Sequence, residues 1–307
     1  MAGIWQTLRK WVVNDNQIPS DHVPDKIDWL RAIPFLLMHL GCFLVFWVGY
    51  SKVAIITAVA LYFVRLFSIG AFYHRYFSHK TYQTNRFWQF IFAVMGGMAA
   101  QRGPLWWSSH HRQHHMCTDR PEDVHSPVHH GFWWSHAGWF LSRRNYYYNP
   151  DRVKDLARFP ELVFIERFDS LIPVLLLSVL LGVGSVLHRF APGLHTSALQ
   201  MAVWGFFIST TFLFHSSVTI NSLTHIIGKR RYPTQDNSRN SWLLAILTLG
   251  EGWHNNHHFY PASARQGFRW WEIDITFYVL KLLEKAGIIW DMRGVPAATL
   301  KKAIKNQ

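Results

Sequence analysis

The chain has 307 residues, of which 50% are hydrophobic and only 16% are charged, and its formal net charge is +13. This composition excludes a disordered chain, a coiled coil and a collagen-like fibre, and it argues against an ordinary soluble enzyme, because too few charged residues remain to cover a surface. The two cysteines, Cys42 and Cys117, exclude a disulfide framework, and the scattered cations carry no zinc-finger, zipper or RNA-recognition signature, so we expect no nucleic-acid partner.

Four apolar stretches of the sequence are long enough to cross a membrane, which takes about 20 residues per helix. They cover about residues 33–50, 53–73, 171–188 and 198–220, and short connections pair them into two hairpins. Outside the two hairpin connections lie 29 of the 31 Lys and Arg residues, and this bias predicts that the termini and the long middle segment are cytoplasmic. Buried helices of a large soluble protein are the alternative, which the charge bias disfavours.

The predicted fold class is therefore an all-α integral membrane protein with four transmembrane helices in two hairpins and a cytoplasmic helical cap. We expect residues 1–307 to form a single membrane domain, whose cap comprises residues 74–170 and 221–307. This multi-pass chain would lie in a bacterial inner membrane, or in the endoplasmic reticulum if its source is eukaryotic.

Nineteen histidines are an unusual number, and nine of them fall into clusters near the cytoplasmic ends of the predicted spans. The clusters read HRYFSH after the second span, HRQHH in the middle segment, NSLTH at the end of the fourth span and HNNHH after it. Residues three and four positions apart share one face of a helix, so each cluster can point its side chains to one place. The topology brings the clusters to one end of the bundle and predicts a site formed by His74, His79, His111, His114, His115, His225, His254, His257 and His258.

Nine imidazoles exceed the ligands of one ion, and two metal ions share them naturally. Imidazole binds Zn, Cu, Fe and Ni, whereas structural zinc usually takes cysteine as well, so a redox pair of iron ions fits this set. Asn221 is a candidate ligand through a water molecule, and Asp119, Asp123 and Glu251 are candidate acceptors for the second ring N–H of ligand histidines. The other histidines of the middle segment are expected around the site or on the surface: His110, His125, His129, His130 and His136.

These motifs, together with SHAGW at 135–139, DNSRN at 236–240 and GEGW before the last cluster, resemble those of the membrane-bound fatty acyl desaturases, in particular the stearoyl-type delta-9 acyl-CoA and acyl-lipid branch. The resemblance covers about residues 30–293. It implies that the nine histidines bind two iron ions, with Asn221 bound through water, and that O2 is a co-substrate in forming a cis double bond, expected at delta-9. It also implies that Gln101 and Trp107 shape an acyl tunnel. His110 stands where the animal acyl-CoA enzymes have an acidic residue, so head-group contacts are not carried over.

The resemblance further implies a fatty acyl substrate, carried on CoA, a carrier protein or a membrane lipid, and a separate electron donor, because the sequence shows no cytochrome b5-like domain. That donor would be a ferredoxin, a rubredoxin or a cytochrome b5-like protein with its reductase. A fatty acid or alkane hydroxylase on the same histidine scaffold is the main alternative. A metal transporter would place ionisable residues in mid-membrane, where only His39 and His215 qualify, and a zinc hydrolase would need the glutamate of an HExxH motif.

Overall fold

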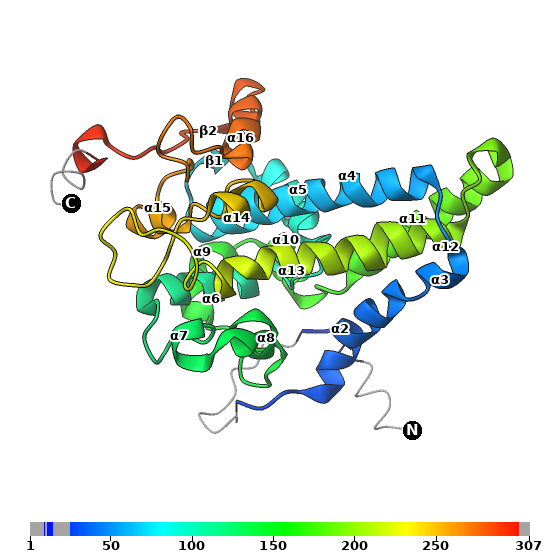
Figure 1. Cartoon of the computed structure of the whole chain (residues 1–307), viewed down its shortest axis with the longest axis horizontal. Coiled ribbons are helices and arrows are strands. Elements are labelled where there is room, and N and C mark those ends of the chain that lie inside the picture. Colours follow the sequence, from blue (N-terminus) through cyan, green and yellow to red (C-terminus); the bar gives the residue numbers. More distant parts are fainter. Residues whose placement is uncertain (1–8, 10, 15–24, 301–307) are drawn as a thin grey trace.

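The computed structural model describes residue 9, residues 11–14 and residues 25–300. Its fold is mostly helical, with long helices that run along the long axis and shorter elements gathered at one end (Figure 1). In this part of the chain, four helical segments are long and apolar enough to cross a membrane: Trp29–Val48, Lys52–Ser78, Leu171–Phe190 and Ala198–Ser222. The helical fold class with four long apolar helices is thereby confirmed, and the chain is a multi-pass membrane protein.

The first hairpin consists of α2 (Trp29–Cys42), α3 (Val45–Val48) and α4 (Lys52–Ser68), and α4 continues without a break into the π-helix η1 (Ile69–Ser78). The hydroxyl of Ser51 caps α4 by accepting a hydrogen bond from the Ala54 amide at 3.1 Å. Gly49 supplies the positive φ of 63° in the turn before it, a conformation that glycine adopts without strain. Local sequence therefore sets where the second span begins.

The second hairpin begins with α11 (Leu171–Phe190) and returns through η4 (Pro192–Leu194) into one continuous helix made of α12 (Ala198–Ala202), the π-helix η5 (Val203–Ile208) and α13 (Ser209–Ser222). A Cβ on Gly184 would lie 2.6 Å from the Cα of Ala198, so the small residue lets α11 and α12 approach closely. Arg65 of α4 is fully buried and donates to Ser209 and Thr210 at 2.6 and 2.7 Å, which joins the two hairpins.

The remaining elements form a cap at the end where the histidines gather. The middle segment contributes β1 (Gln83–Thr84), α5 (Arg86–Gly97), α6 (Pro104–Cys117), α7 (Pro127–His130), η2 (Trp134–Gly138), α8 (Trp139–Leu141), η3 (Pro150–Val153), α9 (Lys154–Ala157) and α10 (Pro160–Arg167). The segment after α13 adds α14 (Trp242–Leu247), α15 (His254–Phe259), α16 (Ile275–Lys285) and β2 (Ile289–Trp290). β1 and β2 pair antiparallel, with Gln83 opposite Trp290, a ribbon that the all-helical prediction leaves out because strands this short carry no periodicity.

A cluster of buried apolar side chains joins η1 to the cap. Phe72 of η1 stacks on Phe92 of α5 with ring centroids 4.0 Å apart. Leu105 of α6 and Leu162 of α10 are buried in the same cluster. This core holds η1 and α6 in fixed positions, and these two elements carry histidines of the first two clusters.

Candidate metal centre

Four segments bring the clustered histidines together at one end of the bundle. His74 lies inside η1, although the sequence analysis placed it just past the span, because the helix continues as a π-helix, a form that is frequent at functional sites. NSLTH was expected at the end of the fourth span, but α13 ends at Ser222, so Asn221 lies on the helix and His225 in the turn after it. The other histidines are His79 after η1, His111, His114 and His115 on α6, and His254, His257 and His258 on α15.

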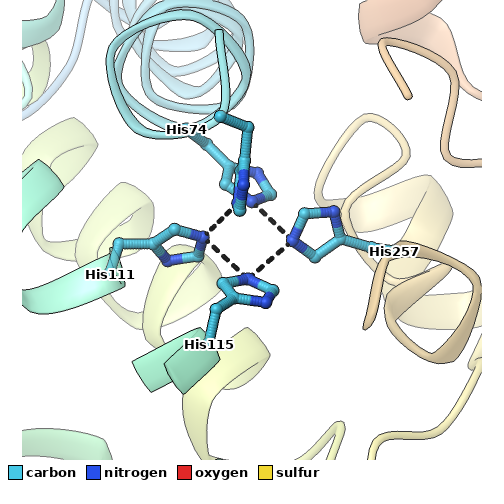
Figure 2. A group of neighbouring side chains, drawn as sticks. His74, His111, His115 and His257 are labelled. Carbon is cyan, nitrogen blue, oxygen red and sulfur yellow. Dashed lines mark hydrogen bonds between the residues drawn. The ribbon is translucent and has the colours of Figure 1, made fainter. Parts of the chain in front are cut away.

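The first histidine group consists of five rings whose ligating nitrogens all lie within 4.8 Å of one another: His74, His79, His111, His115 and His257. Figure 2 shows His74, His111, His115 and His257 with ring nitrogens turned toward one another. Neighbouring Nε2 atoms are 2.7 Å apart between His79 and His111, 3.1 Å between His111 and His115, 2.9 Å between His115 and His257, and 3.0 Å between His257 and His74. The five nitrogens therefore converge on one small space.

The second histidine group consists of four rings whose ligating nitrogens also lie within 4.8 Å of one another: His114, His225, His254 and His258. The Nε2 atoms of His225 and His254 are 3.0 Å apart, and those of His114 and His258 are 3.4 Å apart. The two groups are neighbours, since the ring centroids of His115 and His258 are 4.5 Å apart. The cap thus contains two adjacent positions at which a metal ion could be held.

The α6 and α15 clusters each divide between the two groups. On α6, His111 and His115 are four residues apart and belong to the first group, while His114 belongs to the second. On α15, the pair that is four residues apart belongs to the second group, while His257 belongs to the first. The residue spacing predicts that each cluster points to one place, whereas each of these helices contributes histidines to both groups.

The donor set fits metal ions better than it fits hydrogen bonding. A neutral imidazole has one N–H and one lone pair, so Nε2 atoms that each face two other Nε2 atoms cannot all be satisfied by hydrogens. Two nitrogens bound at about 2.1 Å to one ion lie about 3.0 Å apart at a right angle and about 3.4 Å apart at a tetrahedral angle, close to the separations found here. Burial, followed by the charge of neighbouring histidines, lowers the pKa of five rings well below its usual value and keeps them in the neutral, metal-binding form: His79, His111, His115, His254 and His257.

Carboxylates contact four of the nine rings at Nδ1, the nitrogen that does not face the other histidines. Three of these four carboxylates are the ones predicted from the sequence. The Nδ1 atoms of the rings lie 2.5 Å from a carboxylate oxygen in the pair His74–Glu251, 2.9 Å in His114–Asp123 and 3.1 Å in His225–Asp119. An Nδ1–H donated to a carboxylate fixes the ring and leaves the Nε2 lone pair for a metal.

Asp236 is the fourth carboxylate and is not among the three predicted from the sequence. Its Oδ2 lies 3.0 Å from Nδ1 of His258. Burial alone would raise the pKa of Asp236, but hydrogen bonds from His258 and Ser238 hold it below its usual range, so the group stays ionised. Three of the four carboxylates contact histidines of the second group. The second group has four histidines and the first has five, so the group with fewer imidazoles has more carboxylates around it. The only sequence signal was the DNSRN motif, whose spacing does not point to His258.

A mostly apolar cavity of about 640 Å³ runs beside both histidine groups and is within the size range of small-molecule sites. His74 and His111 of the first group and His114 and His254 of the second line it. Its other walls include residues of α2, α4, α11 and α13. The cavity therefore reaches from the histidines into the membrane-spanning part of the protein.

Asn221, Gln101 and Trp107 all line this cavity. The side chain of Gln101 donates to the Ser217 hydroxyl at 2.6 Å. Trp107 stacks on His111, with ring centroids 5.0 Å apart. The residues that the sequence analysis assigned to an acyl tunnel and to a water-linked ligand thus lie along one apolar space beside the histidines.

The chain is similar to known proteins over most of its length. The fatty acid desaturase family model matches residues 50–293. The sn-1 stearoyl-lipid 9-desaturase of Anabaena variabilis is 33% identical over 276 residues, which cover 87% of this chain and 94% of the relative. The acyl-CoA 5-desaturase AL21 of Anemone leveillei is 34% identical, with 94% of this chain and 91% of the relative covered. The chloroplastic palmitoyl-monogalactosyldiacylglycerol delta-7 desaturase of Arabidopsis thaliana is 35% identical, with 78% and 62% covered.

Proposed function

The chain belongs to the fatty acid desaturase family, and on this premise we propose that it is an O2-dependent di-iron enzyme that introduces a cis double bond at the delta-9 position of a saturated acyl chain. As a fatty acid desaturase it is an oxidoreductase. The observation that carries the finer proposal is the apolar cavity that borders two adjacent groups of histidines. This arrangement can place the middle of an acyl chain beside two metal ions.

Iron is the metal that we assign to the nine histidines and, through water, to Asn221. Imidazole also accepts Zn, Cu and Ni, but zinc has no redox chemistry, and neither cysteine belongs to the two groups. When bound, the ions would supply the oxidising chemistry that amino acid side chains lack. Desaturation takes one hydrogen from each of two adjacent CH2 groups, and these two hydrogens, two protons and two electrons reduce O2 to two molecules of water.

The residues of the chain itself bind and orient the acyl substrate. Leu66, Val174 and Phe214 are among the apolar side chains that line the cavity, where they would hold the acyl chain and exclude water. Trp107 lies against His111 and also faces His74, with ring centroids 6.0 Å apart in the second contact. Holding one CH2 pair next to the metal centre is the contribution that such a cavity makes to the rate.

The delta-9 position and the acyl carrier are the finer parts of the proposal. The likeness to the stearoyl-lipid 9-desaturase supports delta-9 and a lipid carrier, with CoA and a carrier protein as the other options. Leu37 of α2 and Val174 of α11 line the cavity, and each is more than half exposed on the surface of the spans. An opening between these helices would suit an acyl chain that enters from the membrane.

We place the site on the cytoplasmic side of the membrane and treat residues 1–307 as one membrane domain. Of the 31 Lys and Arg residues, 29 lie outside the two hairpin connections, which supports this orientation. The spans and both cap segments contribute residues to the same cavity, which supports one functional unit among the described residues.

A separate ferredoxin, rubredoxin or cytochrome b5-like protein, served by its reductase, would supply the two electrons. The net charge of +13 would attract an acidic donor to the cytoplasmic face. We therefore expect turnover with such a donor to slow as ionic strength rises, because salt screens charges on exposed surfaces. A rate that stays constant from low to high salt, at saturating acyl substrate, would contradict docking by charge.

Asp236→Asn should weaken metal binding about 10- to 100-fold, because the variant keeps the shape of the side chain but loses the charge that orients His258. The measurement is iron per chain in the purified protein after dialysis against a graded chelator series. Asp151→Asn is the matched control, since the Asp151 side chain is 72% exposed and pairs only with the exposed Lys154 among the ion pairs of the described residues. Equal iron retention in the two variants would remove Asp236 from the site.

The proposed function is tested by expressing the full chain in a host that lacks unsaturated fatty acids, with iron and an electron donor supplied. Lipid extracts are then analysed by mass spectrometry with localisation of the double bond. A new cis double bond at delta-9 is the expected result. A double bond elsewhere would correct the position, a hydroxylated lipid would correct the reaction type, and an unchanged lipid profile with the protein present in the membrane would overturn the proposal.

A further inference from the structure

Three histidines outside the metal centre form a continuous chain of hydrogen bonds. His39 of α2 and His215 of α13 contact each other through their Nε2 atoms at 3.1 Å. His215 Nδ1 lies 3.0 Å from His136 Nε2, on η2. The chain ends on the Phe35 carbonyl, 2.8 Å from His39 Nδ1, and on the Ser222 hydroxyl, 3.0 Å from His136 Nδ1. These are the two mid-membrane histidines of the sequence analysis and the histidine of the SHAGW motif.

All four hydrogen bonds can be formed by neutral rings. The Phe35 carbonyl can only accept, so His39 Nδ1 carries a hydrogen and His39 Nε2 accepts from His215 Nε2. His215 Nδ1 then accepts from His136 Nε2, and His136 Nδ1 accepts from the Ser222 hydroxyl. The Ser222 hydroxyl also lies 3.0 Å from the Val218 carbonyl, and in this arrangement its hydrogen goes to His136. Away from water, polar groups that pair across helices hold those helices together.

The same three segments each contribute a phenylalanine to the wall of the acyl cavity: Phe35, Phe140 and Phe214. The ring centroids are 5.0 Å apart for Phe35–Phe214, 5.2 Å for Phe140–Phe214 and 5.5 Å for Phe35–Phe140. Phe35 precedes His39 by four residues, Phe140 follows His136 by four, and Phe214 adjoins His215. The histidine chain therefore fixes α2, the η2–α8 segment and α13 relative to one another, and so fixes the three rings.

One end of the chain lies beside the metal centre. Ser222 follows Asn221, which lines the cavity, and the hydroxyl of Ser135 donates to the Asn221 carbonyl at 3.2 Å. The turn that begins here leads to His225 of the second group. The three phenylalanines are thus held in a fixed relation to the histidines that line the same cavity.

We propose that His39, His215 and His136 are positioning residues that hold the Phe35–Phe140–Phe214 wall in place and thereby select which CH2 pair of the acyl chain is desaturated. This inference rests on the proposed function, because it concerns the same cavity. A shift of α2 along α13 would move one wall of the cavity relative to the metal centre. The acyl chain would then be held in more than one position along the cavity, and neighbouring CH2 pairs would compete for the place next to the metal centre.

The test measures double-bond position in the product. His215→Leu removes both central hydrogen bonds with an apolar side chain that the membrane accepts, and it should lower the ratio of the main to the neighbouring positional isomer about tenfold, within the discrimination that one methylene typically allows. His39→Leu breaks the same His39–His215 link and should lower the ratio in the same direction. The double variant should be no worse than His215→Leu, because the bond between His39 and His215 is already lost in that variant. His215→Gln keeps a donor and an acceptor and should retain more of the ratio than His215→Leu.

His188→Leu is the matched control, because His188 is an exposed histidine of α11 that does not line the cavity. Iron per chain and protein amount are measured in every variant. If His215→Leu does not accumulate, the His39→Leu variant still tests the link between His39 and His215. An unchanged isomer ratio in a well-folded, iron-loaded His215→Leu enzyme would overturn the inference. An absence of any double bond with the wild-type chain would instead overturn the proposed function, so the two failures are distinguishable.

Discussion

His257→Ala should abolish desaturation and lower the iron content of the purified protein. The Nε2 atom of His257 lies 3.0 Å from that of His74 and 2.9 Å from that of His115. Its removal therefore takes away one of the five nitrogens that converge in the first group. The side chain is 1% exposed, and alanine leaves a gap that no neighbouring imidazole on α15 can fill, since the other two belong to the second group. Loss of a direct ligand should exceed the cost of about 10- to 100-fold that is typical when a hydrogen-bond partner of a ligand is lost.

The measurement pairs turnover with iron per chain, both on protein purified without added chelator. His188→Ala is the control, because it removes an imidazole from an exposed position on α11 and should leave both values unchanged. A His257→Ala protein that retains turnover and full iron content would remove this residue from the ligand set and would question the assignment of the whole first group.

The four spans could be predicted from the sequence because a helix in a membrane must satisfy its own backbone hydrogen bonds, so a long apolar stretch allows few other structures. The π-helical segments within these helices could not be predicted in the same way. A π-helix closes its hydrogen bonds over one more residue than an α-helix does. A run of apolar residues is compatible with either form, so the sequence does not show that α4 continues as the π-helix η1 through His74. The two-residue ribbon of β1 and β2 was missed since its partners are far apart in the chain.

The gathering of nine histidines could also be predicted, because their spacing and the topology both place them at one end. The division of the α6 and α15 histidines between two groups could not be predicted. It depends on how each helix is rotated about its axis, and that rotation is set by packing against η1 and the turn after α13. Asp236 and the chain from His39 to His136 were missed for a related reason. His39 and His215 are 176 residues apart, and a contact between them leaves no local pattern in the sequence.

Arg75→Met should destabilise the cap strongly and weaken metal binding as well. Arg75 is 1% exposed, and its guanidinium donates to Glu251 at 2.7 Å, to Asp274 at 2.9 Å and to the Ala264 carbonyl at 2.6 Å. Burial alone would raise the pKa of Glu251, but Arg75 and His74 hold it at about 2, so the carboxylate that contacts His74 stays ionised. Removing one partner from a buried ion pair typically costs about 3–5 kcal/mol, because the other charges remain buried without compensation.

We therefore expect Arg75→Met to lower the midpoint of thermal unfolding in detergent and to reduce the iron that is retained against a chelator. Arg86→Met is the matched control, because Arg86 also pairs with a glutamate, at 2.7 Å, but its side chain is 63% exposed and such pairs contribute little to stability. A melting midpoint equal to that of the control would show that the buried network around Arg75 does not stabilise the cap. Loss of iron at an unchanged melting midpoint would instead show that Arg75 acts on metal binding, through Glu251 and His74, and that none of its contacts is needed for the stability of the cap.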